Sequence, residues 1–216
     1  MKKRFEKEIK SKEFRVTIFG SARVKKNTKE YNQIYTLGKL LGERGIDLIT
    51  GGGPGIMEAA SMGHKNGKKA IKQKVHTIGL SIKLPKEQKI NKSIGVVKTF
   101  RHFSERLDNF MLLSNVIIVT HGGVGTLLEL FYSWQLVQVK QTCDIPIILL
   151  GPQWPPLIKW LEEEVLKRGY INQQDLGVLF LAKDDKETIK MVDQAYKEFK
   201  KGSKKFCLNY KKYKLY

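Results

Sequence analysis

Residues 116–130, VIIVTHGGVGTLLEL, decide the fold, because three kinds of structure follow one another within them. The continuous apolar run predicts a buried strand, the glycine cluster predicts a tight loop, and the leucines that follow begin a helical pattern. Residues 46–60, IDLITGGGPGIMEAA, repeat this order, and Pro54 suits the first position of the second helix. Two such units are typical of a parallel sheet whose crossovers are helices.

The rest of the chain extends this alternation in both directions. Apolar runs predict further strands at 14–20, 75–82, 95–97, 145–151 and 178–182. Apolar residues at helical spacing predict helices at 31–44, 54–66, 101–114, 127–140, 156–168 and 187–201. The sequence therefore predicts an α/β fold: one doubly wound, Rossmann-like domain with a mainly parallel sheet over residues 13–201. A basic tail at 1–12 and a basic, aromatic tail at 202–216 flank this domain.

Composition favours a globular chain and excludes several classes of protein. The 216 residues are 41% hydrophobic, and the only cysteines, Cys143 and Cys207, form no CxxC pair, which rules out a disulfide framework or a cysteine-based zinc site. The histidines show no HExxH spacing, so we predict no metal site and no cofactor. The basic start has no apolar segment behind it, and no run is long enough for a membrane helix. We therefore expect a cytoplasmic protein without a membrane partner.

The net charge of +19 is concentrated at the two ends of the chain. Residues 1–12 hold six basic and two acidic groups, and residues 197–216 hold eight lysines and one glutamate. Aromatic residues between the C-terminal lysines are suited to stacking on bases, which keeps a nucleic-acid partner open as an alternative. No nucleic-acid motif accompanies this charge, so lysines that keep the protein soluble are the favoured interpretation.

The two glycine clusters predict a site for a phosphate group. In a parallel sheet, ligands bind beyond the carboxyl ends of the strands, and both clusters fall there. Glycine lets the backbone approach a ligand closely, and the free N–H groups at a helix start favour an anion. Neither cluster matches GxxxxGK[ST] or GxGxxG. A mononucleotide or sugar phosphate fits these short loops better than a dinucleotide.

Two charged residues near the second cluster each have two interpretations. Thr126 and Glu129 have the spacing of a capping box, which would make both residues structural. Alternatively, Glu129 points its carboxylate into the ligand crevice. Arg106 precedes the strand at 116–120 by a distance that places it toward the crevice end, beside an apolar stripe. The alternative for Arg106 is a surface arginine paired with Asp108 or Glu105.

These motifs together resemble the LOG ("Lonely Guy") family of cytokinin-activating phosphoribohydrolases and related nucleotide 5′-monophosphate nucleosidases, once labelled lysine decarboxylase-like. The resemblance extends from about residue 14 to residue 182. It rests on FGSA at 19–22, TGGGPGIMEAA at 50–60, LPKEQ at 84–88, ERLDNFMLLSN at 105–115 and GGVGTLLEL at 122–130.

The resemblance implies roles for nine residues. Glu129 and Arg106 match the family's catalytic glutamate and arginine. It also implies that the phosphate is held by Gly122, Gly123, Gly125 and Thr126. Further substrate contacts are implied for Ser21, Gly52 and Gly53. The chain departs from the family pattern at His121, where the family has proline, and at Leu107, where a lysine is common.

The resemblance predicts a hydrolase that cleaves the N-glycosidic bond of a nucleoside 5′-monophosphate, AMP or a cytokinin-type nucleotide, to a free base and ribose 5-phosphate. It also predicts a homodimer or a larger homo-oligomer. The alternative is a non-catalytic protein that binds or carries a nucleotide or cofactor phosphate on the same loops. Lysine decarboxylation is rejected, because nothing in the sequence marks a lysine for a pyridoxal Schiff base.

Overall fold

The computed structural model describes residues 5, 11–71, 74–84 and 89–202. Within this part of the chain, seven strands form a sheet in which every pairing is parallel. The strands are β1 (Arg15–Phe19), β2 (Asp47–Thr50), β3 (Thr77–Ile82), β4 (Val96–Phe100), β5 (Val116–Val119), β6 (Ile147–Leu150) and β7 (Leu179–Ala182). The predicted doubly wound, Rossmann-like α/β fold is confirmed.

Helices connect successive strands except β3 and β4, and a further helix follows the last described strand. They are α2 (Lys29–Glu43), α3 (Ile56–Gly67), α4 (Phe103–Leu113), α5 (Val124–Gln138), α6 (Trp154–Trp160), α7 (Gln173–Leu176) and α8 (Asp185–Lys200). A short 3₁₀ turn, η1 (Lys68–Ala70), extends α3, and a π-helical segment, η2 (Leu161–Leu166), extends α6. The alternation that the sequence predicted is therefore present along the described chain.

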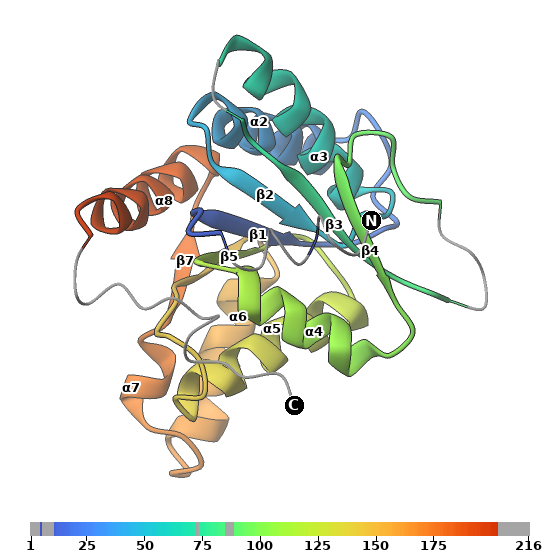
Figure 1. Cartoon of the computed structure of the whole chain (residues 1–216). Helices are drawn as coiled ribbons and strands as arrows, with labels where there is room; N and C mark the ends of the chain where they lie inside the picture. Colours follow the sequence, from blue (N-terminus) through green and yellow to red (C-terminus); the bar gives the residue numbers. More distant parts are fainter. Residues whose placement is uncertain (1–4, 6–10, 72–73, 85–88, 203–216) are drawn as a thin grey trace.

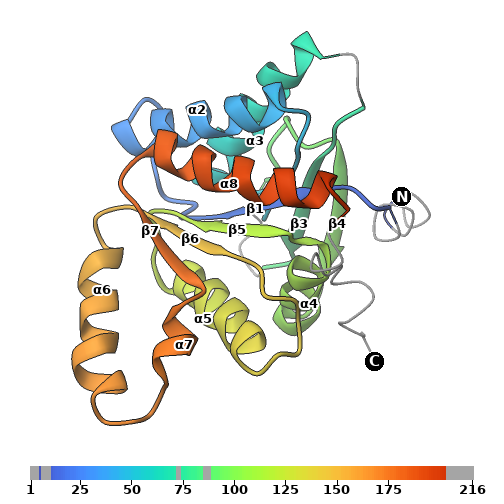
Figure 2. The same ribbon diagram turned by 90° about the vertical axis from the view of Figure 1, so that its left-hand side faces the viewer.

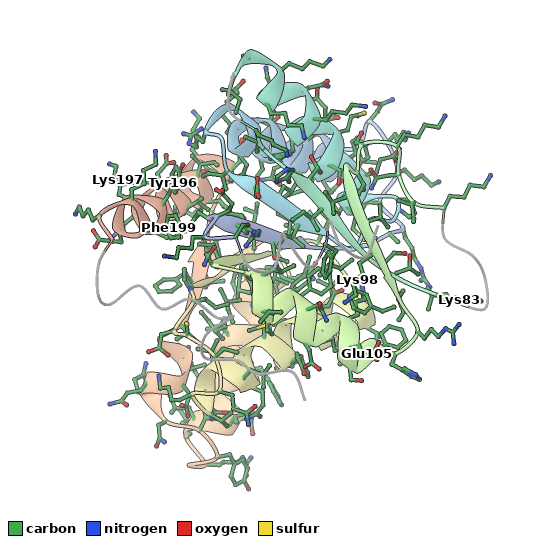
Figure 3. All side chains as sticks on the ribbon, in the orientation of Figure 1. Lys83, Lys98, Glu105, Tyr196, Lys197 and Phe199 are labelled. Atoms are coloured by element: carbon green, nitrogen blue, oxygen red, sulfur yellow. The ribbon has the colours of Figure 1, made fainter. Side chains whose placement is uncertain are left out.

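The helices cover the sheet on both faces. Helices α2, α3 and α8 lie on one face, and α4, α5 and α6 lie on the other (Figures 1 and 2). Each face has its own apolar core, because the strands present buried side chains in both directions. On the α8 side, Phe14 packs against the rings of Tyr196 and Phe199, which Figure 3 labels on that helix.

The strand order places a crevice beside β1. The sheet runs β4-β3-β2-β1-β5-β6-β7, so the chain moves outward from β1 to β4 and then returns to lay β5 along the other side of β1. Thr17 of β1 is in register with Ile49 on one side and Ile117 on the other. Connections leave β1 and β5 in opposite directions, which opens a crevice at the carboxyl ends of these strands.

Several boundaries differ from the sequence predictions. Helix α3 begins at Ile56, and Pro54 lies outside it, because Gly55 takes a φ of 65° and the Ile56 N–H donates to the Ser21 carbonyl. Strand β4 continues to Phe100, well past the predicted end at residue 97. The short helix α7 was not predicted, and a capping box between Asn172 and Asp175 holds its start.

Most residues of the two predicted tails lie outside the described residues, so the division into tails and domain stays a prediction. Phe5, which is described, is buried in the core on the α4 side of the sheet. Cys143 is disulfide-bonded, a feature that the sequence did not predict. Across the described ranges, no helix is long and apolar enough to span a bilayer. The same residues contain no cluster of three His, Cys, Asp or Glu side chains that could bind a metal.

Candidate functional site

The carboxyl ends of β1, β2, β3 and β5 surround a cleft of about 500 Å³. This is the position that the switch in strand order defines. Eight of the nine residues singled out from the sequence line it: Ser21, Gly52, Gly53, Arg106, Gly123, Gly125, Thr126 and Glu129. The two glycine loops therefore belong to one site, and Gly122 is the single predicted residue that does not line it.

Arg106 and Glu129 form a buried ion pair in this cleft. Arg106 projects from α4 and Glu129 from the second turn of α5, and Arg106 Nη1 lies 3.2 Å from Glu129 Oε1. Arg106 Nε donates to the carbonyl of Leu80 on β3 at 2.7 Å, and the guanidinium lies over the ring of Phe110. These contacts fix the guanidinium from three directions and aim it at the carboxylate.

The structural alternatives for this pair are both wrong. Arg106 is only 8% exposed, so it is not a surface arginine. Helix α5 begins at Val124 with Gly123 as its N-cap, which makes Thr126 the third helical residue. Glu129 is then too far along the helix to reach back to the cap, and its carboxylate faces the cleft. The helix starts earlier than the apolar pattern indicates, because the glycine loop itself supplies its first turn.

Burial perturbs the pKa of both partners. Burial raises the pKa of Glu129 to about 7, although the charge of Arg106 opposes this rise. Burial also lowers the pKa of the Arg106 guanidinium, and Glu129 counteracts that effect. A carboxyl group that titrates near neutral pH is suited to accept a proton from water and to release it again.

The N-terminus of α5 opens into the same cleft. No side chain caps this helix start, and its first turn contains no acidic residue. A Cβ added at Gly123 or Gly125 would have no heavy atom within 4 Å, so neither glycine is required by packing. Both residues line the cleft. Free N–H groups, the positive end of the helix dipole and room at the backbone together form a site for an anion.

The first glycine loop makes room for the guanidinium. A Cβ at Gly51 would lie 2.3 Å from Arg106 Nη2, so only glycine lets Arg106 pass along this loop undisturbed. The side chain of Asn91 donates to the carbonyls of Gly52 and Gly53, at 3.1 and 3.0 Å. Asn91, which the sequence gave no reason to choose, thus holds the loop from the β3–β4 connection.

Ser21 connects the loops around the cleft. Its backbone N–H donates to the His121 carbonyl at 2.8 Å, and its own carbonyl accepts from the N–H of Ile56 at 3.0 Å. The loop after β1 is therefore fastened to the loop after β5 and to the start of α3. These bonds keep the two glycine loops in a fixed relation on either side of Ser21.

Gly122 supports the second loop from behind. A Cβ here would lie 2.1 Å from the hydroxyl oxygen of Thr126, so glycine is needed for packing. Its carbonyl accepts from Gln153 Nε2 at 3.0 Å, and its N–H donates to Gln153 Oε1 at 3.4 Å. Gly122 thus fixes the loop against the residue that precedes α6.

Neither departure from the family pattern lies in the cleft. The His121 side chain lines a neighbouring hollow, where its ring lies against Gly151, and burial lowers its pKa. Leu107 is 4% exposed and belongs to the buried face of α4. The cleft walls therefore keep the residue types that the motif contains.

Other lining residues were missed by sequence reasoning. Arg23, Met57, Ser81, Ile82, Leu84 and Phe103 are among them. Arg23 follows the first strand directly in GSAR, which was a usable signal, because loops at the carboxyl ends of strands carry ligand contacts. Phe103 gave no local signal, since its 49% exposure depends on the direction in which α4 leaves β4.

The fold and this cleft define the class of protein: a Rossmann-like α/β protein with a ligand cleft at the switch point of its parallel sheet. The family model described as "Possible lysine decarboxylase" matches residues 57–192. The chain is also 30% identical over 193 residues to the "Probable cytokinin riboside 5'-monophosphate phosphoribohydrolase LOGL2" of Oryza sativa subsp. japonica, covering 86% of this chain and 75% of the relative. The chain belongs to this family, the LOG family.

Two further comparisons extend this result. The chain is 30% identical over 133 residues to the "Pyrimidine/purine nucleotide 5'-monophosphate nucleosidase" of Escherichia coli (strain K12), covering 59% of this chain but only 29% of that enzyme. Among solved structures, the molybdenum cofactor binding protein of Rippkaea orientalis matches with a TM-score of 0.63 at 19% identity, covering 85% of this chain and 98% of that one. The structural match shows a shared fold.

Proposed function

We propose that this protein hydrolyses the N-glycosidic bond of a nucleoside 5′-monophosphate, AMP or a cytokinin-type nucleotide, and releases the free base and ribose 5-phosphate. One observation carries the proposal: the buried Arg106–Glu129 pair lies in the same cleft as the uncapped N-terminus of α5. The names of the relatives from Oryza sativa and Escherichia coli support this choice of reaction, since both describe the release of a base from a nucleotide.

The start of α5 would hold the phosphate. Its free N–H groups and dipole favour a dianion, and the Thr126 hydroxyl adds a further donor at the wall. Gly123 and Gly125 would let the phosphate oxygens approach the backbone. A phosphate held there leaves the ribose to extend toward the second turn of the helix, where Glu129 lies.

Glu129 would act on the ribose and on water. The bond between C1′ and the base nitrogen breaks, its electron pair leaves with the base, and positive charge develops on the sugar. The carboxylate stabilises this charge, orients a water molecule and accepts its proton as the water oxygen bonds to C1′. The departing base takes up a proton from solvent, and Glu129 later releases its proton to solvent, so that one water molecule is consumed in all. Arg106 orients the carboxylate and stabilises negative charge on the base or the phosphate.

The test is to mix the purified protein with AMP and with other monophosphates and to measure free base. We expect adenine and ribose 5-phosphate in equal amounts. Glu129→Gln keeps the size of the side chain but removes its charge, so we expect a loss of about 10²–10⁴-fold in kcat with the melting temperature little changed. Absence of base release from every common monophosphate by the folded protein contradicts the proposal.

The second candidate is a protein that carries a phosphate-bearing ligand without converting it. The departures at His121 and Leu107 were the sequence features in its favour, but neither side chain lines the cleft. The buried pair is not required for carriage alone, which favours the hydrolase. Tight binding of a monophosphate with no base released would decide for the carrier.

Decarboxylation of lysine, which the family description suggests, receives no support from the cleft. Among the described residues, the lining contains no lysine that could form a Schiff base. The anion site at α5 and the arginine in the cleft also disfavour a cationic substrate such as lysine. Assay of the protein with lysine and pyridoxal phosphate should yield no cadaverine.

We also propose that the protein self-associates through α5. Val124, Leu128 and Phe131 are 84%, 45% and 38% exposed and lie on one face of this helix, beside the cleft. An apolar stripe of this kind is typical of a surface that another subunit covers. A homodimer or larger homo-oligomer is thus expected, with the cleft close to the contact.

A nucleic-acid partner stays a weaker alternative, and a cytoplasmic location stays a prediction. The lysine-rich segments at 1–12 and 203–216 lie almost entirely outside the described residues. A gel shift with DNA or RNA that weakens with salt and disappears on removal of residues 203–216 would favour this partner.

A further inference from the structure

Arg23 lines the cleft and has no part in the function proposed above. It lies in the loop after β1, where Gly20, Ser21 and Ala22 also face the cleft. Its backbone N–H donates to the Ser21 hydroxyl oxygen at 3.0 Å. Because the Ser21 backbone is fastened to His121 and Ile56, this bond fixes the Arg23 backbone relative to both glycine loops.

The charge of Arg23 is free to meet an anion. Across the described ranges, its guanidinium makes no ion pair and no side-chain hydrogen bond. Other cations nearby differ in this respect, since Lys26 pairs with Glu58 at 2.9 Å and Arg106 pairs with Glu129. Arginine presents a planar fork of donors that matches phosphate oxygens, so an unpaired guanidinium on a concave wall is suited to a phosphate.

The N-terminus of α5 alone does not neutralise the charge of a phosphate group. The N-terminus of α5 offers N–H groups and roughly half an elementary charge, whereas a phosphate monoester carries nearly two negative charges at neutral pH. Ser21 N–H bonds to His121, immediately before the second glycine loop, so Arg23 is two residues from a direct contact with that loop. Arg23 and the N-terminus of α5 line the same cleft, so one anion bound there can be shared between them.

We propose that Arg23 binds the 5′-phosphate together with the N-terminus of α5, and that this residue makes the site select nucleotides over nucleosides. The proposal rests on the proposed function, because that function supplies the monophosphate as substrate. It adds a binding residue at the rim of the cleft and a physical basis for the choice of substrate class. Arg23 does not contact the reacting bond in this arrangement.

The test compares Arg23→Gln with Lys25→Gln in equilibrium binding of AMP and of adenosine. Lys25 is exposed on the same loop but does not line the cleft, so it controls for the loss of one positive charge. We expect Arg23→Gln to weaken AMP binding by about 10–100-fold and to leave adenosine binding unchanged. Lys25→Gln should change AMP binding by less than about threefold. Arg23→Lys should fall between the two, because it keeps the charge but loses the fork.

Turnover measured on the same proteins separates the two proposals. If Arg23 acts on phosphate alone, its loss raises KM for AMP and lowers kcat much less. If wild-type protein binds AMP but releases no adenine, the hydrolase proposal fails, while the binding comparison still decides on Arg23. Equal AMP affinity in wild type and Arg23→Gln overturns the role of Arg23, as does an equal loss for AMP and adenosine. Unchanged melting temperatures are the check that each variant is folded.

Discussion

At the level of single residues, Glu129 combines burial with a role that requires a charge. A carboxylate in a poorly hydrated site holds its proton more tightly than in water, which is why burial raises the pKa of Glu129 to about 7. Arg106 limits this rise but does not cancel it. The pair is therefore poised so that a modest change in pH alters the charge of the cleft.

We predict that activity rises with pH as Glu129 loses its proton. The carboxylate form accepts the proton of water, so a plot of kcat/KM for AMP should increase through a pKa near 7. In a variant such as Arg106→Gln, loss of the neighbouring positive charge should move this rise in kcat/KM to higher pH. A profile that is flat from pH 5.5 to 8.5 would contradict the assignment of Glu129.

The same shift predicts a change in stability with the opposite sign. The folded protein binds the proton of Glu129 more tightly than the unfolded chain, whose ordinary pKa is 4.5. The free energy of unfolding should therefore decrease as pH rises from about 4.5 to about 7 on account of this group. Glu129→Gln should lose this contribution, which denaturant titrations of both proteins across the window would measure.

A third prediction at the level of single residues concerns Gly51. Gly51→Ala would place a methyl group 2.3 Å from Arg106 Nη2, and the flexible guanidinium would move away from Glu129. A displacement of about 1 Å in such a site costs about 10²-fold in rate, so we expect kcat to fall by that order with little loss of stability. Gly95→Ala, at a position with ordinary contacts outside the cleft, is the matched control. An active Gly51→Ala protein would show that Arg106 need not be held in place.

The positions of Arg106 and Glu129 were only partly predictable from the sequence. The spacing from Arg106 to the strand that follows it indicated a position near the crevice, and the structure agrees. Its three contacts could not be predicted, because Leu80 and Glu129 reach it from different elements. For Glu129, spacing alone favoured the capping box, and only the true start of α5 at Val124 excludes it.

At the level of elements, the N-terminus of α5 does two things at once. It begins a helix and it leaves an anion site open, because glycines replace the acidic or capping residues that would otherwise satisfy its N–H groups. The helix thus gives up some stability of its own at the place where a ligand is expected to bind.

We predict that Gly125→Asp trades ligand binding for helix stability. The added side chain meets no heavy atom within 4 Å of its Cβ, and its negative charge favours the helix start while repelling a phosphate. AMP binding should weaken by about 100-fold or more, and the melting temperature should stay equal or rise. Gly125→Asn has the same shape without the charge and should weaken AMP much less. Equal losses in both variants would mean that bulk, and not charge, closes the site.

Element boundaries were predicted less well than element types. Helix α3 starts two residues after Pro54, because a hydrogen bond from Ile56 to Ser21 in another loop fixes its first turn. The π-helical segment Leu161–Leu166 lies within the helix predicted at 156–168, whose apolar spacing does not distinguish π from α geometry, and the short helix α7 has no periodic signal of useful length. Local patterns reveal an element, whereas contacts from distant parts of the chain set its ends.

At the level of the whole molecule, α5 leaves an apolar stripe beside the cleft. We predict that Leu128→Glu lowers the particle mass toward that of one 24.8 kDa chain, because a charge is costly within a buried subunit contact. Light scattering on wild type and variant measures this. Val139→Glu, the same kind of change at the far end of α5, is the control. A wild-type protein that already has the mass of one chain would contradict self-association.

The whole fold was more predictable than the site. Seven apolar runs and the helices between them sufficed for a parallel, doubly wound sheet, because the central strands β1, β2, β5 and β6 are buried along their whole length, while the edge strands β4 and β7 are partly exposed. No local sequence pattern predicts the order of the strands in the sheet. It is this order that brings the loops of β1, β2 and β5 to one cleft, which Arg23 and Gly123 both line.

The Arg106–Glu129 pair has a further consequence, because both side chains come from one unbroken stretch, residues 103–138, in which α4, β5 and α5 follow one another. The facing wall is supplied from far earlier in the chain, by residues 20–23 and 51–53. Exchanging the side chains of Ala22 and Arg23 would alter which molecules are admitted while the later stretch keeps its own geometry, whereas Gly51 has to stay glycine because it makes room for Arg106. The architecture thus separates the residues that would choose the ligand from the Arg106–Glu129 pair itself.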